Sequence, residues 1–260
     1  MSEPRNFDLD AYSPARMALL AETAGVAKAR LALPPLFVLA VLAGAFIAFG
    51  ALFYAVTVTG STLGDGPTRL LGGIAFSLGL VLVVIAGAEL FTGNNLIVMA
   101  WAHGQVGSRA LLRNWGVVYV GNLVGGVATA LAVLLSGIAT GPLADTVIAI
   151  AEAKAALPAL EAFFRGVLCN ALVCLAVWLC FAARDVSGKI LAILFPTSAF
   201  IAIGFEHSVA NMFLMPLGFM LAGTDPIWPT LVNLVPVTLG NIVGGGGLVA
   251  LTYWFCYLRG

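Results

Sequence analysis

Two stretches, GAELFTGN at 87–94 and GFEHSVAN at 204–211, share the pattern G-x-E-x-x-x-x-N and lie 117 residues apart. A second pair, NWGVVYVGNLVGG at 114–126 and NLVPVTLGNIVGG at 233–245, lies 119 residues apart. Two independent matches at nearly one spacing indicate an internal repeat. We therefore predict one domain over 34–260, made of two repeats near 34–140 and 160–258.

The sequence around these motifs has the composition of a membrane protein. Of its 260 residues, 61% are hydrophobic and 9% are charged, whereas soluble domains contain about 25% charged residues. A membrane-spanning helix needs about 20 apolar residues. We predict an all-α integral membrane protein with six spans, near 36–58, 70–101, 114–137, 162–184, 190–221 and 230–258. The net charge of zero, without a basic cluster, gives no sign of nucleic-acid binding.

The second and fifth spans are long and carry the polar motifs inside them, so we predict that both are broken helices. Free backbone groups at a break cost several kcal/mol each in hydrocarbon, and a break is tolerated only against protein or a watery cavity. Because each half has three spans, the second half enters the membrane in the opposite sense. Inverted repeats with paired broken helices place a solute pathway near the midplane.

The distribution of Lys and Arg predicts the orientation. Nine cations fall on one side of the membrane and three on the other, which places both termini in the cytoplasm. The nine are Arg5, Arg16, Lys28, Arg30, Arg109, Arg113, Arg184, Lys189 and Arg259, and the three are Arg69, Lys154 and Arg165. Residues 1–33 lack the apolar core of a signal peptide. We expect them to remain as a cytoplasmic segment with a surface helix that begins at Ser13 and Pro14.

Polar side chains at the breaks have a structural interpretation and a functional one. We favour a scaffold role for Glu89 and Glu206, with each carboxylate accepting hydrogen bonds from free backbone N–H groups of its own break. Four asparagines are expected to tie the broken ends to their neighbours: Asn94, Asn211, Asn122 and Asn241. His207 differs, because an ionisable group inside a span is a functional candidate by default.

These motifs resemble those of the formate/nitrite transporter family. The resemblance rests on AELFTGN at 88–94, Asn114-Trp115 with Gly121-Asn122, GFEHSVANMF at 204–213 and GNIVGG at 240–245, and it runs collinearly over about residues 7–258. It implies a homopentamer of aquaporin-like protomers, each with its own pore, in the cytoplasmic (inner) membrane of a bacterium or archaeon. It implies lipid as the surroundings and no cofactor.

The resemblance also implies roles for individual residues. His207 matches the pore histidine, Asn170 the asparagine that pairs with it, and Lys154 the lysine of the extracytoplasmic vestibule. Two further groups match the apolar constrictions and the loop at the first break. The constrictions correspond to Phe76 and Leu80 with Phe200 and Val173 opposite, and the gating loop to Leu90, Phe91 and Thr92.

An apolar constriction opposes the passage of an anion, since removing the hydration shell of a carboxylate-sized ion costs several kcal/mol. Desolvation favours the neutral form of a weak acid. We therefore expect the anion to be attracted by Lys154, to cross as the neutral acid and to leave charged. His207, or a water that it holds, would supply the proton.

Among three weak acids we favour formate as the substrate, with nitrite second and hydrosulfide third. The run VCLAVW at 173–178 and MPLG at 215–218 favour formate, whereas the sequence at 89–93 is closer to nitrite and hydrosulfide members. A redox subunit is disfavoured because one intramembrane histidine cannot supply a haem ligand pair. A neutral-solute channel is disfavoured because neither break contains Asn-Pro-Ala. Four cysteines without a C-x-x-C motif are expected to be packing thiols: Cys169, Cys174, Cys180 and Cys256.

Overall fold

The computed structural model describes residues 10–259, and every regular element in this range is helical. The first half contains α1 (Pro14–Arg30), α2 (Leu33–Val58), α3 (Asp65–Val81), η1 (Leu82–Gly87), η2 (Gly93–Leu96), α4 (Ile97–Ala102) and α5 (Ser108–Ser136). The second contains α6 (Pro142–Ala155), α7 (Ala159–Ala182), α8 (Val186–Ile203), α9 (Ser208–Leu221), α10 (Ile227–Ile242), η3 (Val243–Leu251) and α11 (Thr252–Tyr257).

Six helical segments of the described chain are long and apolar enough to cross a membrane, as predicted. They are Leu33–Val58, Asp65–Gly87, Ser108–Ser136, Ala159–Ala182, Val186–Ile203 and Ile227–Tyr257. Many large apolar side chains on these helices face outward, for example Leu135 and Phe195. Such a surface fits a lipid environment and no aqueous one. The protein is therefore a multi-pass membrane protein.

The helices pack as two bundles that share one core. α2 packs on α3 and α5, and α7 packs in the same way on α8 and α10. Small residues permit this closeness: a Cβ on Gly125 would lie 2.0 Å from the carbonyl oxygen of Val41, and one on Gly244 would lie 2.0 Å from that of Val167. The glycine pairs of the repeat therefore allow backbone contact between helices.

Both predicted helix interruptions are present. The second span ends at Gly87 and helical structure resumes at Gly93, and the fifth ends at Ile203 and resumes at Ser208. Each interruption begins at a glycine with positive φ, Gly87 at 84° and Gly204 at 86°. Glycine adopts this conformation without steric cost, which explains why the shared G-x-E pattern begins with glycine.

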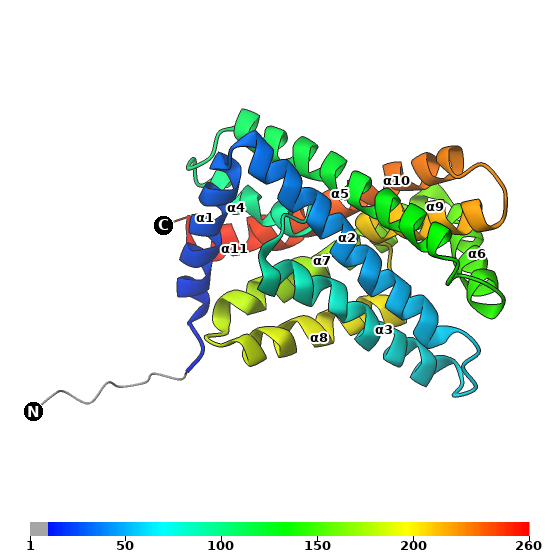
Figure 1. Cartoon of the computed structure of the whole chain (residues 1–260). Coiled ribbons are helices and arrows are strands. Elements are labelled where there is room, and N and C mark those ends of the chain that lie inside the picture. The colour runs from blue at the N-terminus through cyan, green and yellow to red at the C-terminus, as the bar shows by residue number, and fades with distance from the viewer. Residues whose placement is uncertain (1–9, 260) are drawn as a thin grey trace, which may run out of the picture.

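Two shorter helices lie at opposite ends of the molecule. Helix α1 begins as predicted, with the Ser13 side chain accepting a hydrogen bond from the backbone of Arg16. Arg5, one of the nine cations used to predict the orientation, lies outside the described residues. Helix α6 was not predicted, although Pro142 occupies its first turn. Figure 1 shows α1 and α11 at one end and α6 at the other. The cytoplasmic position of the termini and the domain boundaries remain predictions.

Candidate functional site

The first interruption is held by one asparagine. The side chain of Asn122 in α5 accepts a hydrogen bond from the backbone N–H of Phe91 at 2.9 Å. Its amide nitrogen donates to the carbonyl oxygens of Ala40 and Glu89, at 2.7 and 2.9 Å. Asn122 thereby provides partners for backbone groups that the broken helix leaves free, as a buried break requires.

The second interruption is held in the same way by Asn241 in α10. Its side-chain oxygen accepts from the backbone N–H of Ser208 at 3.0 Å, and its amide donates to the carbonyl oxygens of Gly166 and Glu206. Asn94 and Asn211 instead donate to the glutamates of their own breaks, both at 2.7 Å. These hydrogen bonds fit the structural role predicted for the four asparagines, which remains a prediction.

The predicted partners of the two glutamates were wrong. Glu89 accepts from the Lys28 ammonium at 2.6 Å and from the Asn94 amide, and no backbone N–H among the described residues donates to its carboxylate. Glu206 accepts from Lys154 at 2.9 and 3.0 Å and from the Asn211 amide. A buried carboxylate needs a countercharge more than a neutral donor. The lysines provide this charge, and Asn122 and Asn241 take over the backbone N–H groups.

Lys28 belongs to the site although sequence reasoning treated it only as a cytoplasmic cation. It occupies the last turn of α1, as Lys154 does in α6. The carbonyl oxygens of both lysines accept from an asparagine amide, Asn114 at 3.1 Å and Asn233 at 3.0 Å. The sequence signal was the tripeptide Ala-Lys-Ala, at 27–29 and at 153–155. The repeated interactions thus extend to α1 and α6, beyond the predicted repeats.

His207 and Thr92 bring the two interruptions together. Nε2 of His207 lies 2.9 Å from Oγ1 of Thr92, and both side chains are buried. Nδ1 of His207 accepts a hydrogen bond from the backbone N–H of Ala210 at 3.1 Å and so caps α9. A backbone N–H can only donate, so the neutral ring carries its proton on Nε2 and donates it to the threonine hydroxyl.

The pairing of Asn170 with His207 that the resemblance implied is absent. The Asn170 amide donates to the carbonyl oxygens of Thr92 and Asn241, at 3.2 and 2.7 Å. Both amide hydrogens are thereby used, and the only side chain hydrogen-bonded to His207 in the described chain is that of Thr92. Asn170 therefore fixes the backbone of Thr92 and contacts the histidine only through it.

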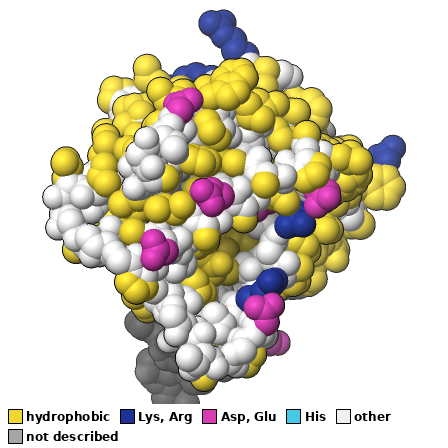
Figure 2. All heavy atoms as spheres, turned by 90° about the vertical axis from the view of Figure 1, so that its right-hand side faces the viewer, with side chains coloured by type: hydrophobic (Ala, Val, Ile, Leu, Met, Phe, Trp, Pro, Cys, Tyr) yellow, Lys and Arg dark blue, Asp and Glu magenta, His cyan; other side chains and the backbone are white. Residues whose placement is uncertain are grey.

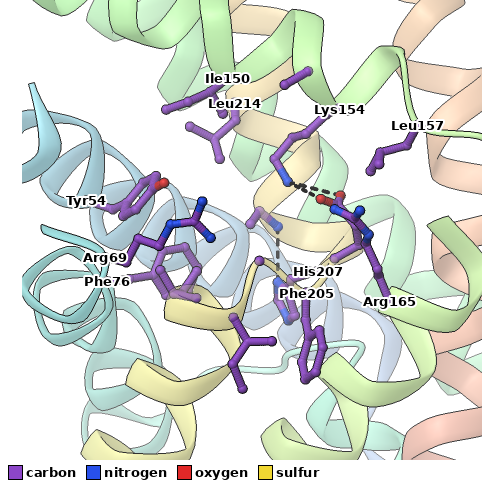
Figure 3. A pocket seen from close by; sticks show the side chains of 16 residues that line it. Tyr54, Arg69, Phe76, Ile150, Lys154, Leu157, Arg165, Phe205, His207 and Leu214 are labelled. Carbon is purple, nitrogen blue, oxygen red and sulfur yellow. Dashed lines mark hydrogen bonds and ion pairs between the residues drawn. The ribbon is translucent and has the colours of Figure 1, made fainter. Parts of the chain in front are cut away.

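A cavity opens on each side of this pair. The first, of about 610 Å³, is lined by Lys154, Glu206 and His207 among others, and we name it the Lys154 cavity (Figure 3). The second, of about 410 Å³, is lined by Lys28, Glu89 and Leu90 and is named the Lys28 cavity. Figure 2 shows the α6 end of the molecule, which is hollowed among charged side chains.

Buried apolar side chains lie between the cavities. Phe76 lines the Lys154 cavity, and Leu80, one turn later on α3, lines the Lys28 cavity. Phe200 packs edge-on against Phe76 with 5.6 Å between ring centroids and stacks on His207 at 5.9 Å. Val173 is buried in the same core. Four of the predicted constriction residues thus lie together, and their function as constrictions remains a prediction.

The ring of Phe91 packs on α5. It lies edge-on against Tyr119 and Trp115, at 5.0 and 6.1 Å between centroids. Unlike Leu90, Phe91 and Thr92 line neither cavity. The cysteine prediction holds for three residues only. Cys169, Cys174 and Cys180 are buried, whereas Cys256 is exposed on the described chain.

The site consists of two cation-bearing cavities, an apolar layer between them and a polar pair within that layer. This arrangement defines a membrane channel or transporter. Residues 15–255 match the family model described as Formate/nitrite transporter, and the chain belongs to this family. It is 42% identical to the formate channel FocA of Escherichia coli K12, covering 100% of this chain and 98% of that protein. It is 43% identical to a probable formate transporter of Methanothermobacter thermautotrophicus, covering 95% and 97%.

Solved structures agree with the sequence relatives. A structure described as a pentameric formate channel with formate bound is 41% identical and superposes with a TM-score of 0.78, covering 86% of this chain and 97% of that one. A structure described as an FNT family ion channel is 34% identical with a TM-score of 0.85, covering 92% and 98%. The all-helical channel fold is therefore established at the level of the whole protomer.

Proposed function

We propose that this protein is a channel for small monovalent weak-acid anions, with formate as its main substrate and nitrite or hydrosulfide as alternatives. The observation that carries the proposal is the hydrogen-bonded pair of Thr92 and His207, buried between two cation-lined cavities. Its formate-channel relatives support formate as the first substrate to test. By the same relationship we propose a homopentamer in the cytoplasmic (inner) membrane of a bacterium or archaeon.

The anion crosses the apolar layer as its neutral acid. The buried rings of Phe76 and Phe200 offer no charge to replace the hydration shell of an anion, and desolvating a carboxylate costs several kcal/mol. The same desolvation raises the pKa of the permeating acid. Proton uptake and release at the two edges of the layer therefore lower the barrier.

The threonine hydroxyl is the group that meets the permeating molecule in this scheme. Because Nε2 of neutral His207 donates to Oγ1 of Thr92, the hydroxyl hydrogen of Thr92 is free to be donated to an anion oxygen. Proton donation by the ring itself requires the imidazolium form. Protonating Nδ1 displaces the hydrogen bond from Ala210, so each relay step through His207 also releases the cap of α9.

Lys154 contributes a directed donor as well as a charge. Its ammonium group gives two hydrogen bonds to the Glu206 carboxylate, and a third N–H remains for an anion in the cavity. The segment 90–95 at the first break would gate the other side, next to the Lys28 cavity. Leu90 lines this cavity, while Phe91 anchors the segment to α5.

Counterflow or current in proteoliposomes tests the proposal by comparing formate, nitrite and hydrosulfide between pH 5 and 8. The expected result is flux of at least one of them, with formate fastest and with flux increasing as pH falls. Absence of flux for all three anions would reject the proposal. Swelling of the vesicles in glycerol without formate flux would support a neutral-solute channel of the aquaporin kind instead.

A further inference from the structure

The Lys154 cavity contains two cations that neither the repeat motifs nor the scheme above use. Arg69 from α3 and Arg165 from α7 line it together with Lys154, and Glu206 is the only acid among its lining residues in the described chain. The Lys154 charge is already balanced by Glu206. The excess positive charge of the cavity therefore comes from the two arginines, which Figure 3 shows on opposite sides of it.

Both arginines are only weakly neutralised. Arg69 lies 3.4 Å from Asp65 and Arg165 lies 3.2 Å from Glu161, each one turn earlier on the same helix. The carboxylates are 90% and 56% exposed and line no part of the cavity. Exposed ion pairs of this spacing are weak. An anion in the cavity can therefore replace the carboxylates as a partner.

The internal repeat shows that Arg165 is dispensable for the fold. The backbone N–H of Glu206 donates to the carbonyl oxygen of Arg165 at 3.3 Å, and that of Glu89 donates to the carbonyl oxygen of Leu39 at 3.2 Å. Leu39 thus occupies the position in the first half that Arg165 occupies in the second. The helix break needs only the main chain at this position, and leucine lines the Lys28 cavity there.

We propose that Arg165, assisted by Arg69, forms a docking subsite in the Lys154 cavity for a planar anion with two equivalent oxygens, such as formate or nitrite. A guanidinium group offers parallel N–H donors that match two oxygens at once, which an ammonium group does not. Hydrosulfide, with a single acceptor atom, gains only from the charge. The inference rests on the proposed function and adds to it a basis for selecting the anion at one mouth of the pathway.

The test uses the full-length channel in proteoliposomes. The accessibility of a terminal tag shows how the channel is oriented in the vesicle. The anion is added to the face that carries this cavity. Arg165→Leu copies the residue of the equivalent position. We expect the half-saturating formate concentration to rise about tenfold, as for loss of a charged hydrogen-bonded contact, with maximal flux preserved. Arg165→Lys keeps the positive charge, so its hydrosulfide uptake should match that of the unmodified protein. Its half-saturating formate concentration should stay raised severalfold.

Two further variants serve as controls. Glu161→Gln removes the competing carboxylate and should lower the half-saturating formate concentration, and Arg109→Leu removes a cation outside both cavities and should change nothing. Unchanged half-saturation in Arg165→Leu overturns the subsite. If Arg165→Lys and the unmodified protein have equal half-saturating concentrations for formate and equal uptake of hydrosulfide, recognition of the two oxygens is overturned. A failure of the proposed function would differ from both, because the unmodified protein would then carry none of the anions.

Discussion

Nε2 of His207 lies 2.9 Å from Oγ1 of Thr92, although the two residues are separated by 115 positions and come from different helix interruptions. Their hydrogen bond joins the two halves of the chain in the apolar layer between the cavities. Each residue is held by its own backbone network, His207 through Ala210 and Thr92 through Asn170. The pair is therefore positioned from both sides, a condition for a directed hydroxyl donor.

Thr92→Val should reduce formate flux by about tenfold or more. Valine has nearly the shape of threonine but lacks the hydroxyl, and a hydrogen bond to a charged group contributes about 1.5–3 kcal/mol. Thr129→Val is a matched control, because the hydroxyl of Thr129 is buried and bonds only to a carbonyl of its own helix. Initial rates of labelled formate uptake measure both variants. Equal rates in the two would remove Thr92 from the mechanism.

His207→Asn should separate the cap from the proton relay. Asparagine retains an acceptor for the backbone N–H of Ala210, since it is a favoured N-cap residue, but it does not titrate. We expect a folded channel whose ratio of formate flux at pH 5 to that at pH 8 differs from that of the unmodified protein. His207→Phe, which loses the acceptor as well, should also be less stable. Unchanged flux of His207→Asn at every pH would exclude the relay.

Glu206→Gln should destabilise the protein more than Glu89→Gln. Each change leaves a lysine without its countercharge, and Lys154 is 15% exposed whereas Lys28 is 34% exposed. Breaking a buried ion pair costs about 3–5 kcal/mol, and the better solvated Lys28 should lose less. Thermal unfolding in detergent, followed by circular dichroism, measures the difference.

The double variant Glu206→Gln with Lys154→Met provides the control for this prediction. Removing both partners leaves no unpaired charge, so part of the lost stability should return. A double variant as unstable as Glu206→Gln alone would mean that the unpaired charge of Lys154 does not cause the instability.

Gly125→Ala and Gly244→Ala should both fold poorly. The added Cβ would lie 2.0 Å from a backbone oxygen in each case, so the helices would have to separate. Gly116→Ala on the same α5 helix meets no atom within 4 Å and should be neutral or slightly stabilising. The yield of monodisperse protein after detergent extraction compares the three. Normal yield of both Gly125→Ala and Gly244→Ala would contradict the close packing.

Much of the fold follows from patterns that a membrane imposes on sequence. Six apolar stretches, the paired glycines and the repeated G-x-E motif identified the spans, the helix contacts and both interruptions, because lipid permits few alternatives for backbone groups. Helix α6 escaped prediction because its 14 residues are too few to span a membrane. Its function became visible only when Lys154 was seen to contact Glu206.

The site was less predictable than the fold for a physical reason. Hydrogen-bond partners across the two halves depend on side-chain geometry, not on spacing. The place of Asn170 on its helix does not reveal that its amide donates to the carbonyl oxygen of Thr92. The glutamates were assigned to backbone donors because no sequence pattern linked Glu89 to Lys28, 61 positions earlier.

The polar networks around the two glutamates are each contained within one half of the chain. Lys28, Glu89, Asn94 and Asn114 all precede α6, and the corresponding residues of the second half follow α5. The first half can therefore neutralise its buried carboxylate during synthesis, before the second half exists. The contact between Thr92 and His207 must wait for α9. The apolar layer that holds this pair can therefore be completed only after both halves have been made.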